Sequence, residues 1–158
     1  TSSGEIVRTT RRNRVQVVVA EDRGIEKAMN KTAVQHPDKS ADTGSYSAGV
    51  ICDGWLYVSG HASLDLRTGE VIRGTIQEET NHTLTSIGKV LKEAGCSFDD
   101  VVKCTCFLAR IEDFDEFDRE YRKFFSDVLP ARSTVQAGLG DGIKVEIDAI
   151  ARISPQKK

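Results

Sequence analysis

Two charged residues in the C-terminal third of the sequence have the types and the spacing of a small catalytic site. Arg132 stands at the entry to a strand-like stretch, just after Pro130, and Glu146 lies in the strand-like stretch that follows. The planar guanidinium of an arginine binds a carboxylate or a phosphate through two parallel hydrogen bonds. A glutamate can handle a proton or a water molecule. If two adjacent antiparallel strands bring both side chains into one cleft, they form a minimal hydrolytic site.

The same pair has a structural interpretation, because an arginine and a glutamate on neighbouring strands more often form a salt bridge than a catalytic site. A metal site is not indicated. His36, His61 and His82 are dispersed, and none has a cysteine or histidine partner at ligand spacing. We therefore expect no metal site.

The sequence contains four cysteines, Cys52, Cys96, Cys104 and Cys106. No hydrophobic signal core precedes them, so we expect a cytoplasmic protein with reduced thiols rather than disulfides. Cys104 and Cys106 are two apart in a β-branched and aromatic stretch, which directs both to one face of a strand. We interpret them as small buried hydrophobic residues rather than as a redox pair.

Length and charge limit the class of protein. The 158 residues suit one domain with its own core, and no apolar run approaches the ~18 residues of a membrane span. There are 22 Lys and Arg against 24 Asp and Glu, for a net charge of −2, which argues against a globally basic nucleic-acid binder. We expect no membrane partner and no nucleic-acid partner.

The elements that must position Arg132 and Glu146 begin near residue 45. Residues 1–44 are expected to be an N-terminal arm, with a possible short strand at 15–20 and loop or arm from there to Gly44. Residues 45–154 are expected to be the domain. Its predicted elements are a hairpin across Asp53-Gly54, a turn at 66–70 with a short strand at 71–72, a helix at 75–94, a strand at 101–109, a helix capped by Asp113 and Glu116, and strands at 133–137 and 143–153.

This order predicts an α/β (α+β) sandwich, in which a mixed sheet carries two helices packed on one face. The other face mixes charged and apolar side chains, which suggests burial in an oligomer whose interface contains polar sites. A solvated face with scattered hydrophobic residues is the alternative. The residues expected on this face are Val101, Lys103, Thr105, Phe107, Lys144, Glu146, Asp148 and Arg152.

Several motifs in a fixed order resemble the RidA/YjgF family of imine and enamine deaminases. Pro130-Ala131-Arg132-Ser133 followed by Lys144-Val145-Glu146-Ile147 is similar to the C-terminal signature of that family. The resemblance extends over about residues 44–153. The remaining motifs that carry it are Tyr46-Ser47, Val58-Ser59-Gly60, and the helix from Asp113-Phe114 with Tyr121, Phe124 and Phe125.

The resemblance implies a chorismate-mutase-like fold that assembles as a homotrimer, with a site in each cleft between subunits. It implies that Arg132 binds the carboxylate of a 2-imino or 2-enamino acid and that Glu146 helps orient the attacking water. Tyr46, Ser59 and Gly60 would line the pocket. The implied enzyme is a hydrolase acting on C=N bonds, which releases a 2-oxo acid and ammonia without a cofactor.

Three further candidate substrate-binding residues depart from the family pattern. His61 stands where many members have glutamine, Thr134 where the archetypal deaminases have cysteine, and Asp118 where many members have asparagine. An ionised Asp118 near Arg132 would pair with it and compete with the substrate carboxylate, or would favour a substrate bearing positive charge. The alternative is that Asp118 faces water.

Other functions stay open at this point. Arg8, Arg11, Arg12 and Arg14 could contact the phosphates of RNA, since RNA binding and ribonuclease activity have been attributed to some family members. A flexible, solvated N-terminus is the plainer interpretation of these arginines. A non-catalytic trimer that binds a small ligand is a further alternative, and so is an aminomuconate-like or aminoacrylate-like enamine as substrate.

Overall fold

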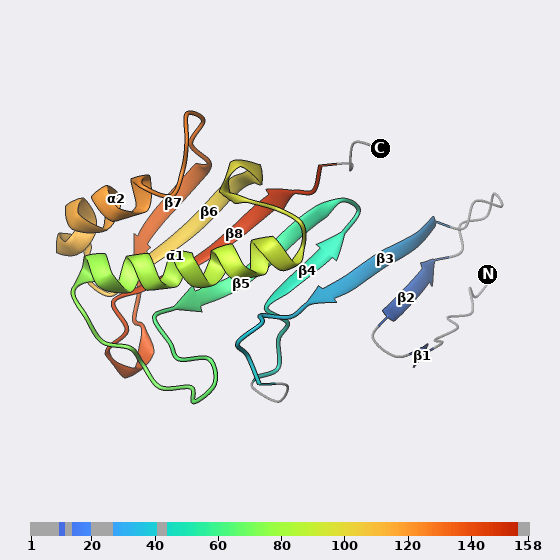
Figure 1. The fold of residues 1–158 in the computed structure, drawn as a ribbon, viewed down its shortest axis with the longest axis horizontal. Helices are drawn as coiled ribbons and strands as arrows, with labels where there is room; N and C mark the ends of the chain where they lie inside the picture. Colours follow the sequence, from blue (N-terminus) through green and yellow to red (C-terminus); the bar gives the residue numbers. More distant parts are fainter. Residues whose placement is uncertain (1–9, 12–13, 20–26, 41–43, 155–158) are drawn as a thin grey trace, which may run out of the picture.

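The computed structural model describes residues 10–11, 14–19, 27–40 and 44–154. Their strands form one mixed sheet in the order β1-β2-β3-β4-β5-β8-β6-β7 (Figure 1). The β6 and β7 strands run parallel, and all other neighbours are antiparallel. The strands are β1 (Thr10–Arg11), β2 (Arg14–Val19), β3 (Lys27–Val34), β4 (Gly49–Cys52), β5 (Trp55–Ala62), β6 (Val101–Leu108), β7 (Ala131–Gln136) and β8 (Val145–Arg152).

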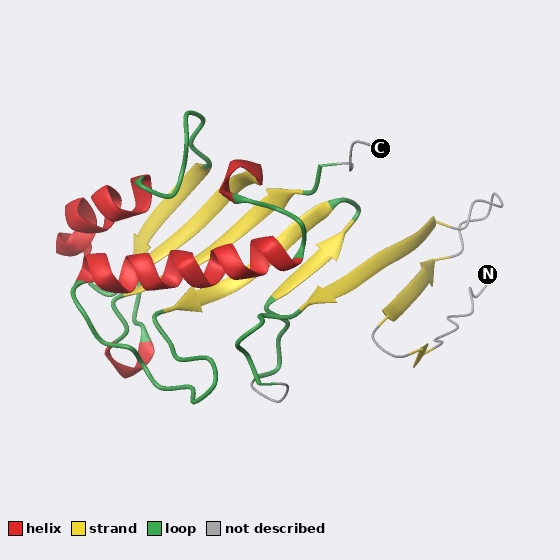
Figure 2. Cartoon of the chain, viewed as in Figure 1, coloured by secondary structure: helices red, strands yellow, loops and turns green. Residues whose placement is uncertain are grey.

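Two α-helices, α1 (Ile76–Glu93) and α2 (Phe114–Arg122), cover the same face of this sheet, as the sequence predicts (Figure 2). The apolar stripe of α1 packs on β5 and β8, and α2 packs against α1 and adds aromatic residues to the same core. Fully buried members of this core include Leu56, Leu84, Phe117 and Ile147. The predicted fold class, with two helices on one side of a mixed sheet, is confirmed.

The hairpin and the first helix form where local signals place them. Asp53 (φ 50°) and Gly54 (φ 78°) make the tight turn between β4 and β5, because both positions need positive φ. At the start of α1, the Thr75 side chain accepts a hydrogen bond from the Glu78 backbone, and the Glu78 side chain accepts one from the Thr75 backbone. This reciprocal cap and Gly95 (φ 72°) after the helix fix both of its ends.

The arm contains more strand than the sequence pattern indicates. The predicted strand at 15–20 is confirmed as β2, but the interpretation of residues 27–34 as loop was wrong, since they form β3. Backbone hydrogen bonds to β2 and β4 hold β3 in the sheet. Such bonds do not require alternating hydrophobic side chains, so the sequence pattern did not indicate this strand. The division at residue 44 stays a prediction, although β3 pairs with β4 across it.

Two local predictions in the domain were wrong. Asp113 has helical dihedrals (φ −80°, ψ 0°) and caps nothing, because the 3₁₀ turn at Ile111–Asp113 leads directly into α2. The short strand at 71–72 is reduced to one bridge between Leu64 and Val71.

The uncovered face of the sheet is polar and apolar in alternation. Along β8, Val145, Ile147, Ala149 and Ala151 point into the core, so Glu146 and the other alternate residues point away from the helices. Val101 was expected on the uncovered face but is buried in the core, because the β6–β8 register shifts between Val101 and Lys103.

Within the described residues, no helix is both long and apolar enough to span a bilayer.

Candidate active site

Arg132 and Glu146 do not lie on adjacent strands, contrary to the sequence-based expectation. The β6 strand runs between β7, which carries Arg132, and β8, which carries Glu146. Arg132 is in register with Cys104 of β6, whose side chain is buried beneath the helices, whereas Glu146 is in register with Phe107. Because the side chains of a strand alternate, Arg132 lies on the helix-covered face of the sheet and Glu146 on the opposite face.

The Arg132 guanidinium lies against an aromatic surface at the edge of the core. Its central carbon is 4.7 Å from the ring centroid of Tyr121 and 5.5 Å from those of Phe114 and Phe117. Such contacts attract a cation through the quadrupole of the ring and fix the plane of the guanidinium. Nη1 also lies 2.7 Å from Oδ1 of Asp118, so the ion pair suggested by the sequence is formed.

A pocket of about 290 Å³ opens at this ion pair, and it is lined by Asp118, Tyr121, Arg122, Leu129, Pro130 and Arg132. Arg122 is held in place by its own backbone contacts: Nη1 donates to the carbonyls of Phe125 (2.6 Å) and Ser126 (3.1 Å). Two guanidinium groups and one carboxylate leave this pocket with a net positive charge, which suits an anionic group. We call the residues that line it the Arg132 cluster.

Thr134 follows Arg132 on the same face of β7, in register with the buried Cys106. Its Oγ1 is buried and has no hydrogen-bond partner among the described residues. A buried hydroxyl without a partner is uncommon. Thr134 does not line the pocket at Arg132, although it is the next residue along this face of β7.

Glu146 lies in a second pocket of about 340 Å³, lined by Tyr46, Ser59, Gly60, Ala62, Leu64, Ile143 and Glu146. We call these residues the Glu146 cluster. Gly60 lies so close to the Glu146 carboxylate that a Cβ at this position would displace the carboxylate. Burial, and to a lesser extent the charge of Asp148, raises the pKa of Glu146 above its ordinary value.

A bulge in β5 presents Ser59 and Gly60 to this pocket. The register with β8 shifts between Val58 and His61, which breaks the regular alternation of the strand. The Ser59 hydroxyl donates to the Ser47 carbonyl (2.6 Å), and the Ser59 backbone N–H donates to Ala48 (3.0 Å). These bonds connect β5 to the segment that carries Tyr46.

His61 does not line the pocket with the other candidates. Its ring is buried, Nδ1 donates to the Ser59 carbonyl at 2.7 Å, and its centroid lies 5.9 Å from that of His36. Burial lowers the pKa of His61 below its ordinary value. The structure therefore places His61 behind Ser59, where it supports the bulge from the core side.

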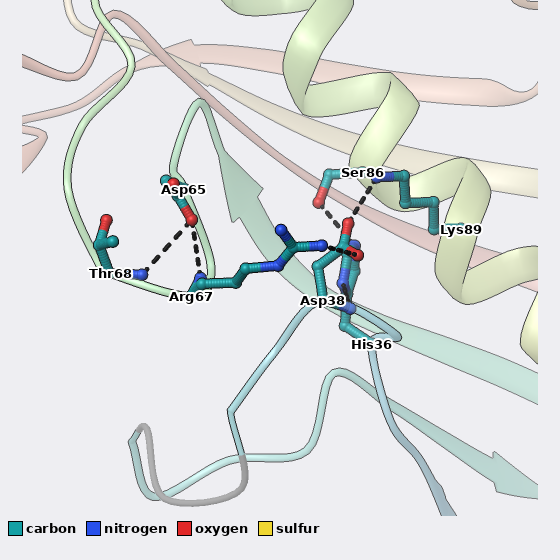
Figure 3. Close-up of polar contacts among 7 residues, drawn as sticks. All are labelled: His36, Asp38, Asp65, Arg67, Thr68, Ser86 and Lys89. Atoms are coloured by element: carbon teal, nitrogen blue, oxygen red, sulfur yellow. Dashed lines mark hydrogen bonds and ion pairs between the residues drawn. The ribbon is translucent and has the colours of Figure 1, made fainter.

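A polar cluster holds the segment before Tyr46 against α1 (Figure 3). The Asp38 carboxylate accepts from Lys89 Nζ at 2.5 Å and from Arg67 at 3.5 Å. His36 Nδ1 accepts from the Asp38 backbone N–H (3.0 Å), so Nε2 carries the proton that bonds to Ser86 Oγ (3.1 Å).

Sequence reasoning missed Glu79, whose side chain is fully buried in α1. Oε2 accepts from the Lys144 backbone N–H (2.9 Å), and Oε1 accepts from Lys144 Nζ (3.0 Å) and the Gly74 N–H (3.2 Å). Glu79 thereby fixes the chain two residues before Glu146. A signal was present, since position 79 has the helical spacing that places it on the buried face of α1 with Ile76 and Thr83.

The chemistry on offer is polar and acid–base in kind. No group of three or more His, Cys, Asp or Glu side chains with a metal-binding arrangement occurs in the described ranges. All four cysteines are free thiols, as predicted, and Cys104 and Cys106 are both buried on the helix-covered face.

Residues 37–153 match the model of the Endoribonuclease L-PSP family. The chain is 42% identical over 116 residues to the Bos taurus protein named 2-iminobutanoate/2-iminopropanoate deaminase, a match that covers 73% of this chain and 85% of the relative. It is 43% identical over 117 residues to a Lactococcus lactis protein named as a candidate regulator, AldR, with 73% and 93% covered.

The fold agrees with these matches. A crystal structure from Entamoeba histolytica, named as a candidate endoribonuclease L-PSP, superposes with a TM-score of 0.71 at 41% identity and covers 77% of this chain and 98% of its own. The fold places this chain in the class of small mixed-sheet proteins with two helices on one face, and the motifs and the matched range agree with it. The chain belongs to the RidA/YjgF (L-PSP) family.

Proposed function

We propose that this protein is an imine and enamine deaminase, a hydrolase acting on C=N bonds. In this proposal it converts reactive 2-imino and 2-enamino acids to 2-oxo acids and ammonia in clefts between the subunits of a homotrimer. The observation that carries the proposal is the placement of Arg132 and Glu146 on opposite faces of one sheet. A site that uses both residues must be assembled from two copies of the chain.

The uncovered face of the sheet supports such an assembly. Tyr57 of β5 is 47% exposed, and it lies in register with Ile150 of β8, which in turn is in register with Lys103 of β6. Apolar side chains on a face that also carries Glu146 are suited to burial against a second copy. The Arg132 cluster of one copy would then face the Glu146 cluster of its neighbour.

The proposed roles follow from the two clusters. Arg132 binds the substrate carboxylate, and Tyr46, Ser59 and Gly60 line the pocket around the carbon of the C=N bond. An iminium carbon is already electrophilic, so the enzyme needs only to position substrate and water and to assist proton transfer. Glu146, whose raised pKa lies closer to neutrality, orients the water and accepts its proton. The reaction calls for no cofactor.

Thr134 and His61 stay predictions as substrate-binding residues. The cytoplasmic location also stays a prediction.

Ammonia release from freshly made imines tests the proposal. An amino-acid oxidase acting on 2-aminobutyrate supplies the imine, and the wild-type protein should accelerate its hydrolysis. Arg132→Ala and Glu146→Gln should each remove the acceleration. If the protein accelerates the hydrolysis of none of a series of imines with different side chains, the deaminase proposal fails. That result would favour a protein that binds a ligand without turnover, and the L. lactis relative is named as a regulator.

Mixed oligomers test the location of the site. When Arg132→Ala and Glu146→Gln chains are unfolded together and refolded at equal ratio, about one quarter of the clefts regain both functional residues by random assortment. Activity should therefore return to about that fraction of wild type. A site contained in one chain would regain nothing, because every chain lacks one of the two residues.

The family description favours one second candidate, RNA binding or cleavage. Of the arginines that suggest it, Arg8 and Arg12 lie outside the described residues. The test is RNA affinity measured over a range of salt concentrations. Strongly salt-dependent binding that disappears when residues 1–14 are deleted would support this function.

A further inference from the structure

Asp118 occupies the part of the site that the proposed reaction needs for the substrate. Its Oδ1 lies 2.7 Å from Arg132 Nη1, and both residues line the same pocket. In the proposed reaction, the carboxylate of the substrate binds that same guanidinium. Two carboxylates that share one guanidinium repel each other, so one reduces the affinity for the other.

We propose that Asp118 is a specificity-determining residue that competes with the substrate carboxylate for Arg132 and so weakens binding of carboxylate-bearing ligands. The inference rests on the proposed function for the identity of the ligand, but the ion pair itself is a property of the folded chain. In the resting site Asp118 neutralises Arg132, and a ligand binds when Asp118 has moved away.

The surroundings of the two residues decide which of them moves. Arg132 is only 22% exposed and lies over the rings of Phe114, Phe117 and Tyr121, which hold the plane of its guanidinium. Asp118 is 46% exposed and has a short side chain that can turn into water. The exchange therefore releases Asp118 to solvent, where its charge is hydrated, and leaves Arg132 in position for the incoming carboxylate.

The size of the effect follows from the exposure of the pair. Solvent-accessible ion pairs of this kind favour the paired state by a factor of about 1.4 to 5. A ligand that needs the unpaired state then has an apparent dissociation constant that is multiplied by one plus this ratio of paired to unpaired states. Removing the competition should therefore tighten carboxylate binding about two- to six-fold.

Asp118→Asn removes the charge and keeps the shape, and Glu116→Gln removes one negative charge from an exposed position on the same helix as a control. Calorimetry measures the dissociation constants of two ligands for the full-length protein. They are 2-oxobutanoate, the carboxylate product of the proposed reaction, and 2-oxobutanamide, its uncharged counterpart. We expect Asp118→Asn to tighten 2-oxobutanoate about two- to six-fold, with the amide unchanged and the control like wild type.

The possible outcomes separate the inference from the proposed function. Equal tightening of acid and amide would mean that the substitution reshapes the pocket, and this overturns the competition. An unchanged or weaker affinity for 2-oxobutanoate, or no binding to any variant, overturns it as well. If Asp118→Asn tightens the acid alone while no imine is hydrolysed by wild type, the competition stands and the deaminase proposal fails.

Discussion

Replacing Glu79 tests whether a buried carboxylate in α1 holds the start of β8. The side chain is 0% exposed and accepts hydrogen bonds from the Lys144 backbone, the Lys144 ammonium and the Gly74 backbone. In Glu79→Ala the two backbone N–H groups lose their acceptor and the ammonium loses its counter-charge. Only the ammonium is able to find water easily, because the Lys144 side chain is 38% exposed.

The expected loss is large for a single substitution. Breaking a buried ion pair costs about 3–5 kcal/mol, and the partial exposure of Lys144 favours the lower end, about 3 kcal/mol. For a chain of this length each kcal/mol lowers Tm by about 2–4 °C, so we expect a decrease of about 6–12 °C. Glu79→Gln keeps one acceptor oxygen, and its loss should be intermediate.

Urea unfolding followed by circular dichroism, at one fixed protein concentration, measures the free energy of unfolding of each variant. Glu93→Ala, at an exposed position of the same helix, is the control and should change this free energy by less than about 0.5 kcal/mol. A loss below about 1 kcal/mol in Glu79→Ala would refute the reasoning, because the two backbone donors must then have found other acceptors.

Three further predictions follow from the described contacts. Burial holds the pKa of His36 below its ordinary 6.5, so the unfolded chain takes up the proton first and stability should fall as the pH drops below 6.5. Urea midpoints at high and low pH measure this change. His36→Gln should make stability depend less steeply on pH. Burial raises the pKa of Cys106 to about 12, so its thiol should react with Ellman's reagent only after unfolding, and labelling of the native protein at this residue would contradict it. Gly60→Ala should displace the Glu146 carboxylate and abolish imine hydrolysis while the protein still folds, which activity and circular dichroism together would show.

Features that depend on a few consecutive residues could be predicted from the sequence. The turn at Asp53-Gly54 and the helix α1 are examples, since positive φ and an apolar stripe are encoded locally. The β3 strand was missed because its pairing partners, β2 and β4, supply the hydrogen bonds, and no alternation in its own residues announces them.

The candidate site was predictable as a set of residues but not as an arrangement. Arg132, Asp118 and Glu146 were named from the sequence, and the first two do form an ion pair. Their separation into two clusters depends on the strand order, in which β6 lies between β7 and β8. The parallel partners β6 and β7 are some thirty residues apart, and no local signal encodes such a pairing. The spacing of Glu79 in α1 indicates a buried position, but its partner Lys144 is distant in sequence and could not be predicted.

The position of β8 has a consequence for how the chain acquires its structure during synthesis. This strand is the last of the described strands in chain order, yet it lies between β5 and β6. Until it emerges from the ribosome, β5 and β6 have no common neighbour. Each then exposes an unpaired edge, and the core lacks the buried side chains of β8. A nascent chain arrested before residue 145 is therefore a target for chaperones and for edge-to-edge aggregation, and the native sheet closes in a late step that joins segments far apart in sequence.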